Sequence, residues 1–258
     1  MKSPLAGRRC LVTGGGSGIG AGIARVLAAH GARVAVLGRR GPALRATIAS
    51  LPGRKSKALA VTADVTDAAG MARAVARVAR AFGGLDVVVA NAGIGGPNRC
   101  ALPGPDRWRA ILTTNLDGLY HTTMAALPHL GDGGRMIAIS SVLGRFGVPG
   151  YTAYCASKHG VIGFTKALAL ELAPRRITVN SICPGWVDTE MAAAGMRGLA
   201  AATHVDFAVA RANALAAVPI GRILQPDEIG ATVAWLCSRG ADGVTGQAIT
   251  HCGGQVMW

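Results

Sequence analysis

The sequence is poor in aromatic and acidic residues. Aromatic side chains make up 4% of the 258 residues, and 13 Asp and Glu stand against 27 Lys and Arg, for a formal net charge of +14. The arginines are scattered and few aromatics are interleaved with them, so a stacking platform is lacking, and we expect no nucleic-acid partner. The charge is typical of an arginine-rich solvated surface. The alternative is attraction to an acidic ligand, such as a phosphate, coenzyme A or an acidic carrier protein.

Long apolar runs and paired cysteines are also lacking. No stretch reaches the roughly 18 uninterrupted apolar residues of a membrane span. The segment from Met1 to Cys10 has no apolar core of a signal peptide, so we expect a cytoplasmic protein without a membrane anchor. Six cysteines occur, without CxxC spacing or a Cys/His cluster. We therefore expect no metal site and a reducing compartment.

Strand-like and helix-like segments alternate along the chain, and no Pro/Gly/Ser-rich linker divides it. Repeated β-α-β units imply a parallel sheet with helices on both faces. The sequence therefore predicts an α/β fold, a single Rossmann-type domain with a doubly wound, seven-stranded parallel sheet. Strands are expected at residues 9–13, 32–37, 57–61, 85–90, 135–140, 177–182 and 247–250. Helices are expected at 18–30, in a stretch that follows the second strand and ends at 51, and at 67–82, 105–130, 153–173 and 226–238.

Residues 188–219 depart from this alternation. The segment is alanine-rich and lies between a predicted strand and a predicted helix. An insertion near the carboxyl end of a strand is where a substrate lid is expected. The alternative is an ordinary helical excursion that packs on the core.

A glycine-rich loop follows the first predicted strand. The run Thr13-Gly14-Gly15-Gly16-Ser17-Gly18-Ile19-Gly20 opens the first helix. Glycines allow a tight turn and let a pyrophosphate approach the helix N-terminus, where free N–H groups favour anions. The position of this run between a strand and a helix predicts a dinucleotide site rather than a plain turn.

The end of the second predicted strand indicates which dinucleotide binds. An NAD enzyme places an acidic residue there, on the ribose hydroxyls, but this chain has Arg39 and Arg40. A guanidinium binds a 2′-phosphate through charge-assisted hydrogen bonds. We therefore predict NADP(H), with Arg39 as the main contact and Arg40 as a helper. The alternative is a pair of exposed turn arginines.

Tyr154 and Lys158 lie four residues apart, on one face of a predicted helix. A phenol has a pKa of about 10, and a fixed ammonium group nearby is expected to lower it toward the working range. Such a pair exchanges a proton with a carbonyl or alcohol oxygen. Redox chemistry at a C–O bond is the first expectation.

These motifs together resemble the short-chain dehydrogenase/reductase family over nearly the whole chain. Thr13 to Gly20 matches TGxxxGxG, Ser141 lies 13 residues before Tyr154, and Tyr154 to Lys158 is YxxxK. One departure is Ala90, which replaces the first Asn of NNAG and puts a local hydrogen bond in doubt. The catalytic residues that the resemblance implies are Asn115, Ser141, Tyr154 and Lys158. The cofactor-binding residues indicated are Gly14, Gly16, Ser17, Gly18, Ile19, Gly20, Arg39, Arg40, Asp64, Val65, Asn91, Ala92, Gly93, Tyr154, Lys158, Pro184, Gly185, Val187 and Thr189.

The resemblance also implies roles for the catalytic set. Tyr154 is the acid in reduction and the base in oxidation, and Lys158 lowers its pKa and binds the nicotinamide ribose. Ser141 donates a hydrogen bond to the carbonyl oxygen, with Ser140 as the second candidate for this role. Asn115 holds a water that links Lys158 to solvent.

The substrate is indicated by kinship alone. Residues 157–168, 183–187 and 218–222 look like ketoreductases of fatty-acid and aromatic-polyketide synthesis, which act on β-ketoacyl groups carried on acyl carrier protein or coenzyme A. The alternatives are an NADP-dependent dehydrogenase of free secondary or cyclic alcohols, and a non-catalytic NADPH sensor. The family resemblance implies a homotetramer, in which Met257 and Trp258 reach a neighbour. The apolar pocket candidates are Val142, Leu143, Phe146, Trp186 and Met191.

Overall fold

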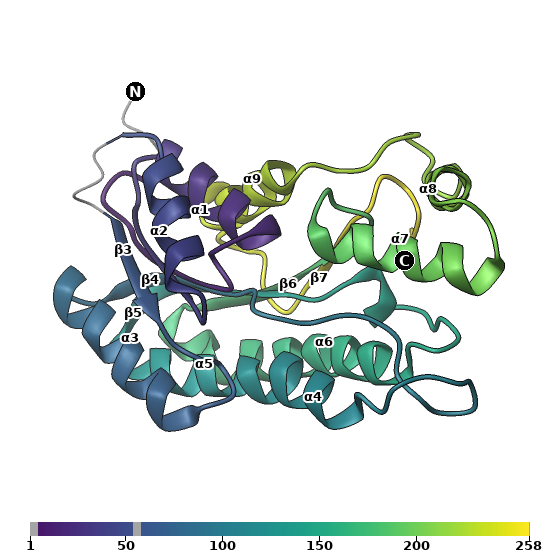
Figure 1. Cartoon of the computed structure of the whole chain (residues 1–258). Helices are drawn as coiled ribbons and strands as arrows, with labels where there is room; N and C mark the ends of the chain where they lie inside the picture. Colours follow the sequence, from purple (N-terminus) through teal and green to yellow (C-terminus); the bar gives the residue numbers. More distant parts are fainter. Residues whose placement is uncertain (1–4, 54–57, 258) are drawn as a thin grey trace.

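The computed structural model describes residues 5–53 and 58–257. Within them one sheet contains seven parallel strands in the order β3-β2-β1-β4-β5-β6-β7 (Figure 1). The order reverses between β1 and β4, so a crevice opens there at the carboxyl ends of the strands. The strands are β1 Arg9–Thr13, β2 Arg33–Gly38, β3 Ala58–Thr62, β4 Leu85–Ala90, β5 Leu130–Ile139, β6 Thr178–Pro184 and β7 Ala248–His251.

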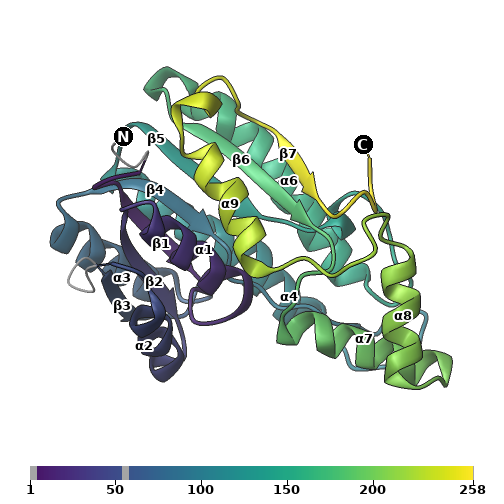
Figure 2. The same cartoon turned by 90° about the horizontal axis from the view of Figure 1, so that it is seen from above.

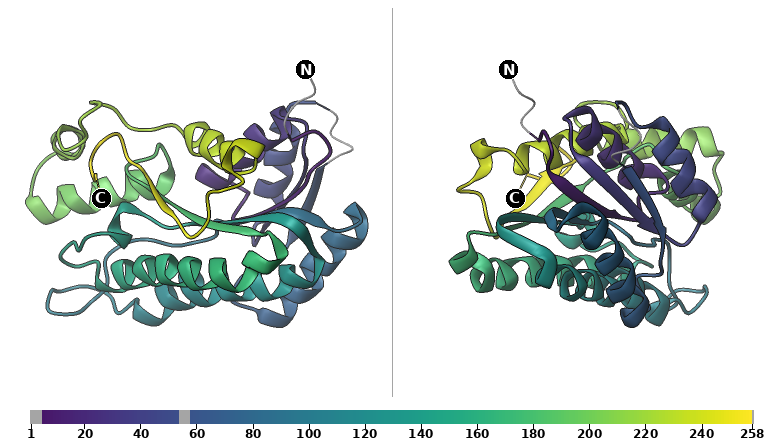
Figure 3. Two further views of the ribbon diagram at one scale, coloured as in Figure 1. Left: turned by 180° about the vertical axis from the view of Figure 1, so that it is seen from behind. Right: turned by 90° about the vertical axis from the view of Figure 1, so that its left-hand side faces the viewer.

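Helices cover both faces of the sheet, which confirms the predicted doubly wound fold (Figure 3). One face carries α1 (Gly18–Ala29), α2 (Gly41–Ser50) and α9 (Pro226–Leu236), and the other carries α3 (Ala68–Phe82), α4 (Trp108–Leu112), α5 (Gly118–Ala126) and α6 (Thr152–Leu172). No helix of the described residues is long and apolar enough to cross a membrane. Nor does any group of three His, Cys, Asp or Glu in that part of the chain have a geometry that could hold a metal ion.

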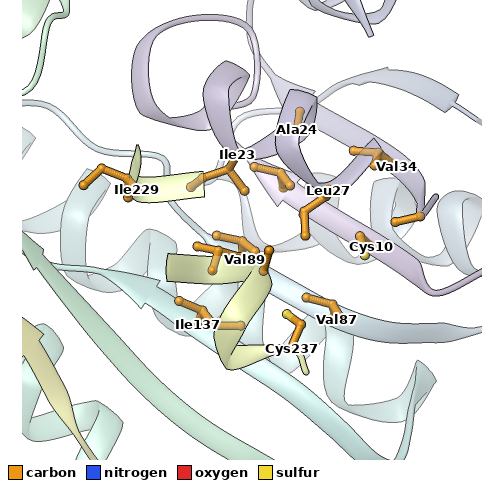
Figure 4. Packing of buried hydrophobic residues seen from close by; sticks show 14 of the residues in the cluster. Cys10, Ile23, Ala24, Leu27, Val34, Val87, Val89, Ile137, Ile229 and Cys237 are labelled. Atoms are coloured by element: carbon orange, nitrogen blue, oxygen red, sulfur yellow. The ribbon is translucent and has the colours of Figure 1, made fainter. Parts of the chain in front are cut away.

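The core lies in two layers because successive strand residues face opposite sides. In β1, Cys10 and Val12 join the cluster under α1 and α9, while Leu11 joins the cluster under α3 and α6. Figure 4 shows the first cluster, with Ile23 and Leu27 of α1 packed toward the strands. Burying such side chains on both sides is what makes the strands read as nearly continuous apolar runs.

The predicted helix over residues 105–130 is wrong in its continuity. The helix begins only at Trp108, and the π-helical turn Thr113–Asp117 separates α4 from α5. Helix α5 gives way at Ala126 to a 3₁₀ turn that contains Pro128. Strand β5 starts at Leu130, five residues before the expected start, in a glycine-rich stretch that concealed it. The other predicted strands lie within two residues of those observed, although Lys57, the expected start of the third, lies outside the described residues.

Two segments extend beyond the sheet on the side of its carboxyl ends. Helices α7 (Glu190–Thr203) and α8 (Phe207–Ala216) occupy residues 188–219 and stand beside the sheet (Figure 2). The C-terminal tail follows β7, and its Cys252 and Val256 pack against Val142. Trp258 lies outside the described residues, so the proposed contact of Met257 and Trp258 with a neighbouring subunit stays a prediction.

Candidate active site

The residues singled out from the sequence gather at one edge of the sheet. Parallel strands place their carboxyl ends together, and the glycine loop, Arg39, Asp64, Asn91, Ser141 and Gly185 each follow a different strand end. Helix α6 brings Tyr154 and Lys158 to the same edge. The structure therefore brings together residues that the sequence distributes from Thr13 to Thr189.

Tyr154 is the group best placed to donate a proton. Burial raises the pKa of its phenol to about 12, while the Ser141 hydroxyl, hydrogen-bonded to it, acts in the opposite direction. Ser141 also accepts a hydrogen bond from Leu143 N at 3.1 Å, which fixes its side chain at the end of β5. Ser140, the second candidate, instead donates to Lys158 O at 2.9 Å and faces away from the phenol. At neutral pH Tyr154 is a protonated acid.

The pKa of Tyr154 lies above the ordinary value of a phenol and not, as was expected, below it, because burial has the largest effect on it. The part that Lys158 plays in lowering this pKa stays a prediction. Lys158 is buried, and its Nζ donates to Ile139 O at 2.8 Å. That ammonium group lies 5.6 Å from the centroid of the Tyr154 ring, over its face rather than at its hydroxyl. Burial of the phenol therefore outweighs attraction to the charge. Burial likewise lowers the pKa of Lys158 to about 8.

Asn115 lies in the π-helical turn and is held by three hydrogen bonds. Its Oδ1 accepts from Ile94 N at 2.8 Å, and its Nδ2 donates to Ile94 O and to Ser157 Oγ, each at 3.0 Å. Ser157 in turn donates to Tyr154 O at 2.8 Å. The Asn115 side chain thus connects the loop after β4 to α6, the helix that carries the phenol. Ser157 was not identified from the sequence, because a serine inside YxxxK carries no signal of its own.

A small cavity of about 10 Å³ lies beside Asn115, a volume that suits one water molecule. Ile139, whose carbonyl accepts from Lys158, also lines this cavity. The water link between Asn115 and Lys158 stays a prediction. Ala90, the departure from the NNAG motif, forms part of the same wall. The remaining lining residues are Thr13, Ala92, Gly118, Leu119, Thr122, Ala138 and Val161.

The glycine loop forms a cradle that side chains would fill. A Cβ at Gly14 would lie 2.8 Å from Ala92 Cα, and a Cβ at Gly20 would lie 2.4 Å from Gly14 O. Gly14 and Gly18 have φ angles of +65° and +52°, which favour glycine. Ser17 and Ile19 stand at the start of α1, where free N–H groups point toward an anion. The loop therefore fits the pyrophosphate of a dinucleotide.

Asn91 fastens this cradle to β4. Its Nδ2 donates to Thr13 O at 2.9 Å, and Thr13 Oγ1 accepts from Asn91 N at 3.1 Å and from Ala92 N at 3.2 Å. Gly93 then brings the chain close to the catalytic residues, since a Cβ there would lie 3.1 Å from Asn115 Oδ1 and 3.6 Å from Lys158 Nζ. These contacts join the dinucleotide cradle to the proton-transfer residues.

The two arginines after β2 are exposed beside the cradle. Arg40 Nη2 donates to Ser17 Oγ at 3.2 Å, and Arg39 Nη1 lies 4.0 Å from an oxygen of Asp64. Val65, the next residue, accepts from His121 at 2.9 Å, which fixes the segment expected to meet the adenine. The guanidinium groups thus lie at the end of β2, where the second phosphate of an NADP-type ribose is expected.

Residues 184–189 close the other end of the cradle. Gly185 N donates to His251 O at 3.1 Å, which holds the end of β6 at Pro184 beside the end of β7. Thr189 Oγ1 donates to Val187 O at 3.1 Å and accepts from Ala192 N, capping α7. A Cβ on Gly18 would lie 3.0 Å from Thr189 Cγ2. The start of α7 therefore reaches the glycine loop.

The predicted pocket residues divide into separate groups. Met191 lies near the phenol, since a Cβ at Gly95 would lie 3.2 Å from its Sδ and 3.5 Å from Tyr154 Cε2. Trp186 instead approaches Gly195 of α7. The other three candidates, Val142, Leu143 and Phe146, pack with the C-terminal tail. Met191 and the phenol thus lie on either side of Gly95.

Comparison with known proteins agrees with this geometry. A family model described as enoyl-(acyl carrier protein) reductase matches residues 14–255. A putative ketoacyl reductase of Streptomyces coelicolor is 42% identical over 248 residues, 95% of each chain. A 3-oxoacyl-[acyl-carrier-protein] reductase of Thermotoga maritima is 34% identical over 255 residues, 98% of this chain and 99% of that one.

A solved structure extends the likeness to the whole backbone. The crystal structure of an actinorhodin polyketide ketoreductase variant with NADPH superposes with a TM-score of 0.92 and 41% identity, and covers 100% of both chains. Sequence and fold thus agree over the whole chain. The chain therefore belongs to the short-chain dehydrogenase/reductase family, whose members are oxidoreductases that use a nicotinamide cofactor to interconvert ketones and alcohols.

Proposed function

We propose that this protein uses NADPH to reduce the ketone of a β-ketoacyl thioester to a secondary alcohol. The observation that carries the proposal is the protonated Tyr154 hydroxyl, hydrogen-bonded to Ser141, at the strand edge where the cradle ends. An acid in this state is ready to donate to a carbonyl oxygen. The names of the relatives, which are ketoacyl and 3-oxoacyl reductases, support a thioester-bound ketone.

Bound NADPH supplies the hydride that adds to the carbonyl carbon. Ser141 and Tyr154 hold the carbonyl oxygen, and Tyr154 gives it the proton that completes the alcohol. The tyrosinate left behind is stabilised by the Lys158 ammonium group, which then returns a proton to it. Asn115 and the adjacent cavity offer a route by which Lys158 recovers that proton from solvent.

Arg39 and Arg40 support the choice of NADP(H) over NAD(H). Both guanidinium groups are exposed at the end of β2, close to Ser17 of the cradle. Within the described residues the two groups contact only the Ser17 hydroxyl and, at 4.0 Å, a carboxylate oxygen of Asp64, so their other N–H groups are available to a phosphate. A neighbouring solved structure with NADPH and another with NADP agree with this choice.

The remaining parts of the proposal concern the pocket and its partners. Residues 188–219 act as the substrate lid, supported by the position of Met191 beside Gly95 and the phenol. The formal charge of +14 suits an acidic carrier protein or coenzyme A. We further propose a homotetramer built through α6 and the C-terminal end, where Leu170 and Met257 are exposed. Light scattering that reports a monomer would reject the tetramer.

A panel of ketones tests the proposal. Consumption of NADPH is followed at equal concentrations of acetoacetyl-coenzyme A, a β-ketoacyl carrier protein and a set of free cyclic ketones. We expect the thioesters to give the highest kcat/KM. A clear preference for free cyclic ketones would instead support a dehydrogenase of free alcohols. Tight NADPH binding without turnover of any ketone would support a non-catalytic sensor.

A further inference from the structure

One buried amide fastens the loop after β4 to the helix that carries the phenol. Asn98 is 3% exposed. Its Oδ1 accepts from Ala153 N at 2.8 Å, and its Nδ2 donates to Thr152 Oγ1 at 2.9 Å. Its backbone N–H donates to Gly150 O at 2.9 Å. Asn98 is thus bonded to three consecutive parts of the approach to α6.

Helix α6 depends on this contact for its first turn. The first N–H groups of a helix have no partner within the helix and are usually satisfied by the side chain of the N-cap residue. Tyr151 is the N-cap of α6, and its side chain makes no such bond. Asn98 supplies the missing acceptor from a segment 55 residues away in sequence. The capped residue, Ala153, immediately precedes Tyr154.

The same loop also forms a wall beside the phenol. A Cβ added to Gly95 would lie 3.2 Å from Met191 Sδ and 3.5 Å from Tyr154 Cε2, so Gly95 lies between these two side chains. The Gly95 carbonyl accepts a hydrogen bond from Arg107 Nη1 at 3.0 Å. Gly95 and Asn98 are only three residues apart. The segment 95–98 therefore contacts the tyrosine ring at one end and the turn that carries the tyrosine at the other.

We propose that Asn98 is a positioning residue that holds the hydroxyl of Tyr154 in register with the substrate-pocket wall formed by residues 95–98. This inference rests on the proposed function, in which Tyr154 is the acid. A proton donor must stay within hydrogen-bond reach of the oxygen that it protonates, and a displacement of about 1 Å costs on the order of 100-fold in rate. Asn98 acts through Ala153 and does not itself contact the substrate carbonyl.

Three variants test this role. Asn98→Ala removes the acceptor and both donors, whereas Asn98→Asp keeps an acceptor for Ala153 N. Asn180→Ala is the matched control. Asn180 is also buried, and its side chain donates to Val244 O at 2.7 Å and accepts from Gln247 N at 3.0 Å. It makes these bonds to the backbone in the middle of β6, away from the phenol. Each variant is measured for kcat, ketone KM, NADPH affinity and Tm.

We expect Asn98→Ala to lower kcat by about 10- to 100-fold with NADPH affinity unchanged, and Asn98→Asp to retain kcat within about threefold of the parent. Asn180→Ala should keep kcat even where its Tm falls as far. The proposal is overturned by parental kcat in Asn98→Ala, by equal kcat losses in Asn98→Ala and Asn180→Ala, or by no rescue in Asn98→Asp. Should Asn98→Ala fail to fold, a folded Asn98→Asp variant that loses tenfold in kcat overturns it as well.

A titration separates this inference from the proposed function, because it needs no ketone. The tyrosinate absorbance of Tyr154 is obtained by subtracting the titration of a Tyr154→Phe protein. Loosening the first turn of α6 admits water to the phenol, so Asn98→Ala should titrate at lower pH than the parent and Asn98→Asp near it. An unchanged titration in Asn98→Ala refutes the positioning role even if no ketone is ever turned over. A shifted titration without turnover rejects the reaction and keeps the role of Asn98.

Discussion

The two ends of the active-site crevice are built by different means. The cofactor cradle, residues 13–20, 39–40 and 91–93, is held by close backbone approach, as at Gly14 and Gly20. The substrate rim, residues 95–105, 188–219 and 252–257, is held by side chains, such as Asn98 and the packing of Cys252 on Val142. The cradle therefore tolerates only glycine at certain positions, while the rim is free to vary in composition. The difference predicts that changes in one part leave the other intact.

The largest expected effect separates chemistry from cofactor binding. Tyr154→Phe removes the proton donor but keeps the ring beside Gly95, so kcat should fall by about 10³-fold, within the range for general acid catalysis. NADPH affinity, which depends on the cradle, should stay within about twofold, and fluorescence titration measures it. Tyr120→Phe, on an exposed part of α5, is the matched control and should keep its full activity. Parental turnover in Tyr154→Phe would refute the proposed acid.

A smaller effect is expected from the cradle alone. Arg39→Ala removes a charged hydrogen bond to the 2′-phosphate, worth about 1–3 kcal/mol, so NADPH affinity should fall about 5- to 150-fold while NADH affinity changes little. Arg73→Ala, which removes an exposed arginine of α3, controls for net charge and should change neither. Equal losses for NADPH and NADH in Arg39→Ala would contradict its role as phosphate selector. The Kd values from titration decide between these outcomes.

A third prediction uses pH to separate proton transfer from cofactor binding. Burial lowers the pKa of Lys158 to about 8, so its ammonium form, which stabilises the tyrosinate formed on reduction, is lost as pH rises through that value. The kcat for reduction should therefore be level below about pH 7.5 and fall toward tenfold lower about one unit above pH 8. NADPH affinity should vary less over this interval. A kcat that is constant or rising up to pH 9.5 would contradict the assignment.

The cradle and the rim also differ in how far the sequence predicts them. Cradle positions are visible because turns with positive φ and close backbone approach demand glycine, as at Gly14 and Gly18, and the seven strands follow from apolar runs. Asn98 and Ser157 were not identified, because their partners lie 55 and 42 residues away in sequence and no local pattern links them. Local patterns reveal backbone demands but not side-chain bonds that only tertiary packing creates.

The pKa of Tyr154 illustrates the same limit. The spacing of Tyr154 and Lys158 correctly places both side chains on one face of α6, but it does not show how deeply the phenol is buried. It also does not show that Lys158 Nζ donates to Ile139 O, on a neighbouring strand. Both facts depend on how α6 lies against the sheet, and burial of the phenol is the main cause of its raised pKa.

The smallest expected effect concerns the seam between the cradle and the catalytic residues. Ala90 is the last residue of β4 and precedes Asn91, whose side chain is hydrogen-bonded to the cradle. Ala90 also lines the cavity of about 10 Å³ beside Asn115. Restoring the family residue with Ala90→Asn fills this volume and adds an amide close to Thr122. At about 24 cal/mol per Å³ the filled volume contributes only about 0.2 kcal/mol, and a new hydrogen bond adds about 1 kcal/mol.

The Tm of Ala90→Asn should therefore rise by about 2–4 °C, with NADPH affinity near that of the parent. Because the amide displaces the water through which Lys158 is proposed to recover its proton, kcat should fall modestly. Ala90→Leu is the control, because it overfills the cavity without a polar group and should lower the Tm. A lower kcat at a raised Tm in Ala90→Asn would mean that the cavity holds a water on the route to Lys158, and that the cradle and the catalytic residues are coupled through it. An unchanged kcat would instead confine the seam to stability and leave the two parts independent.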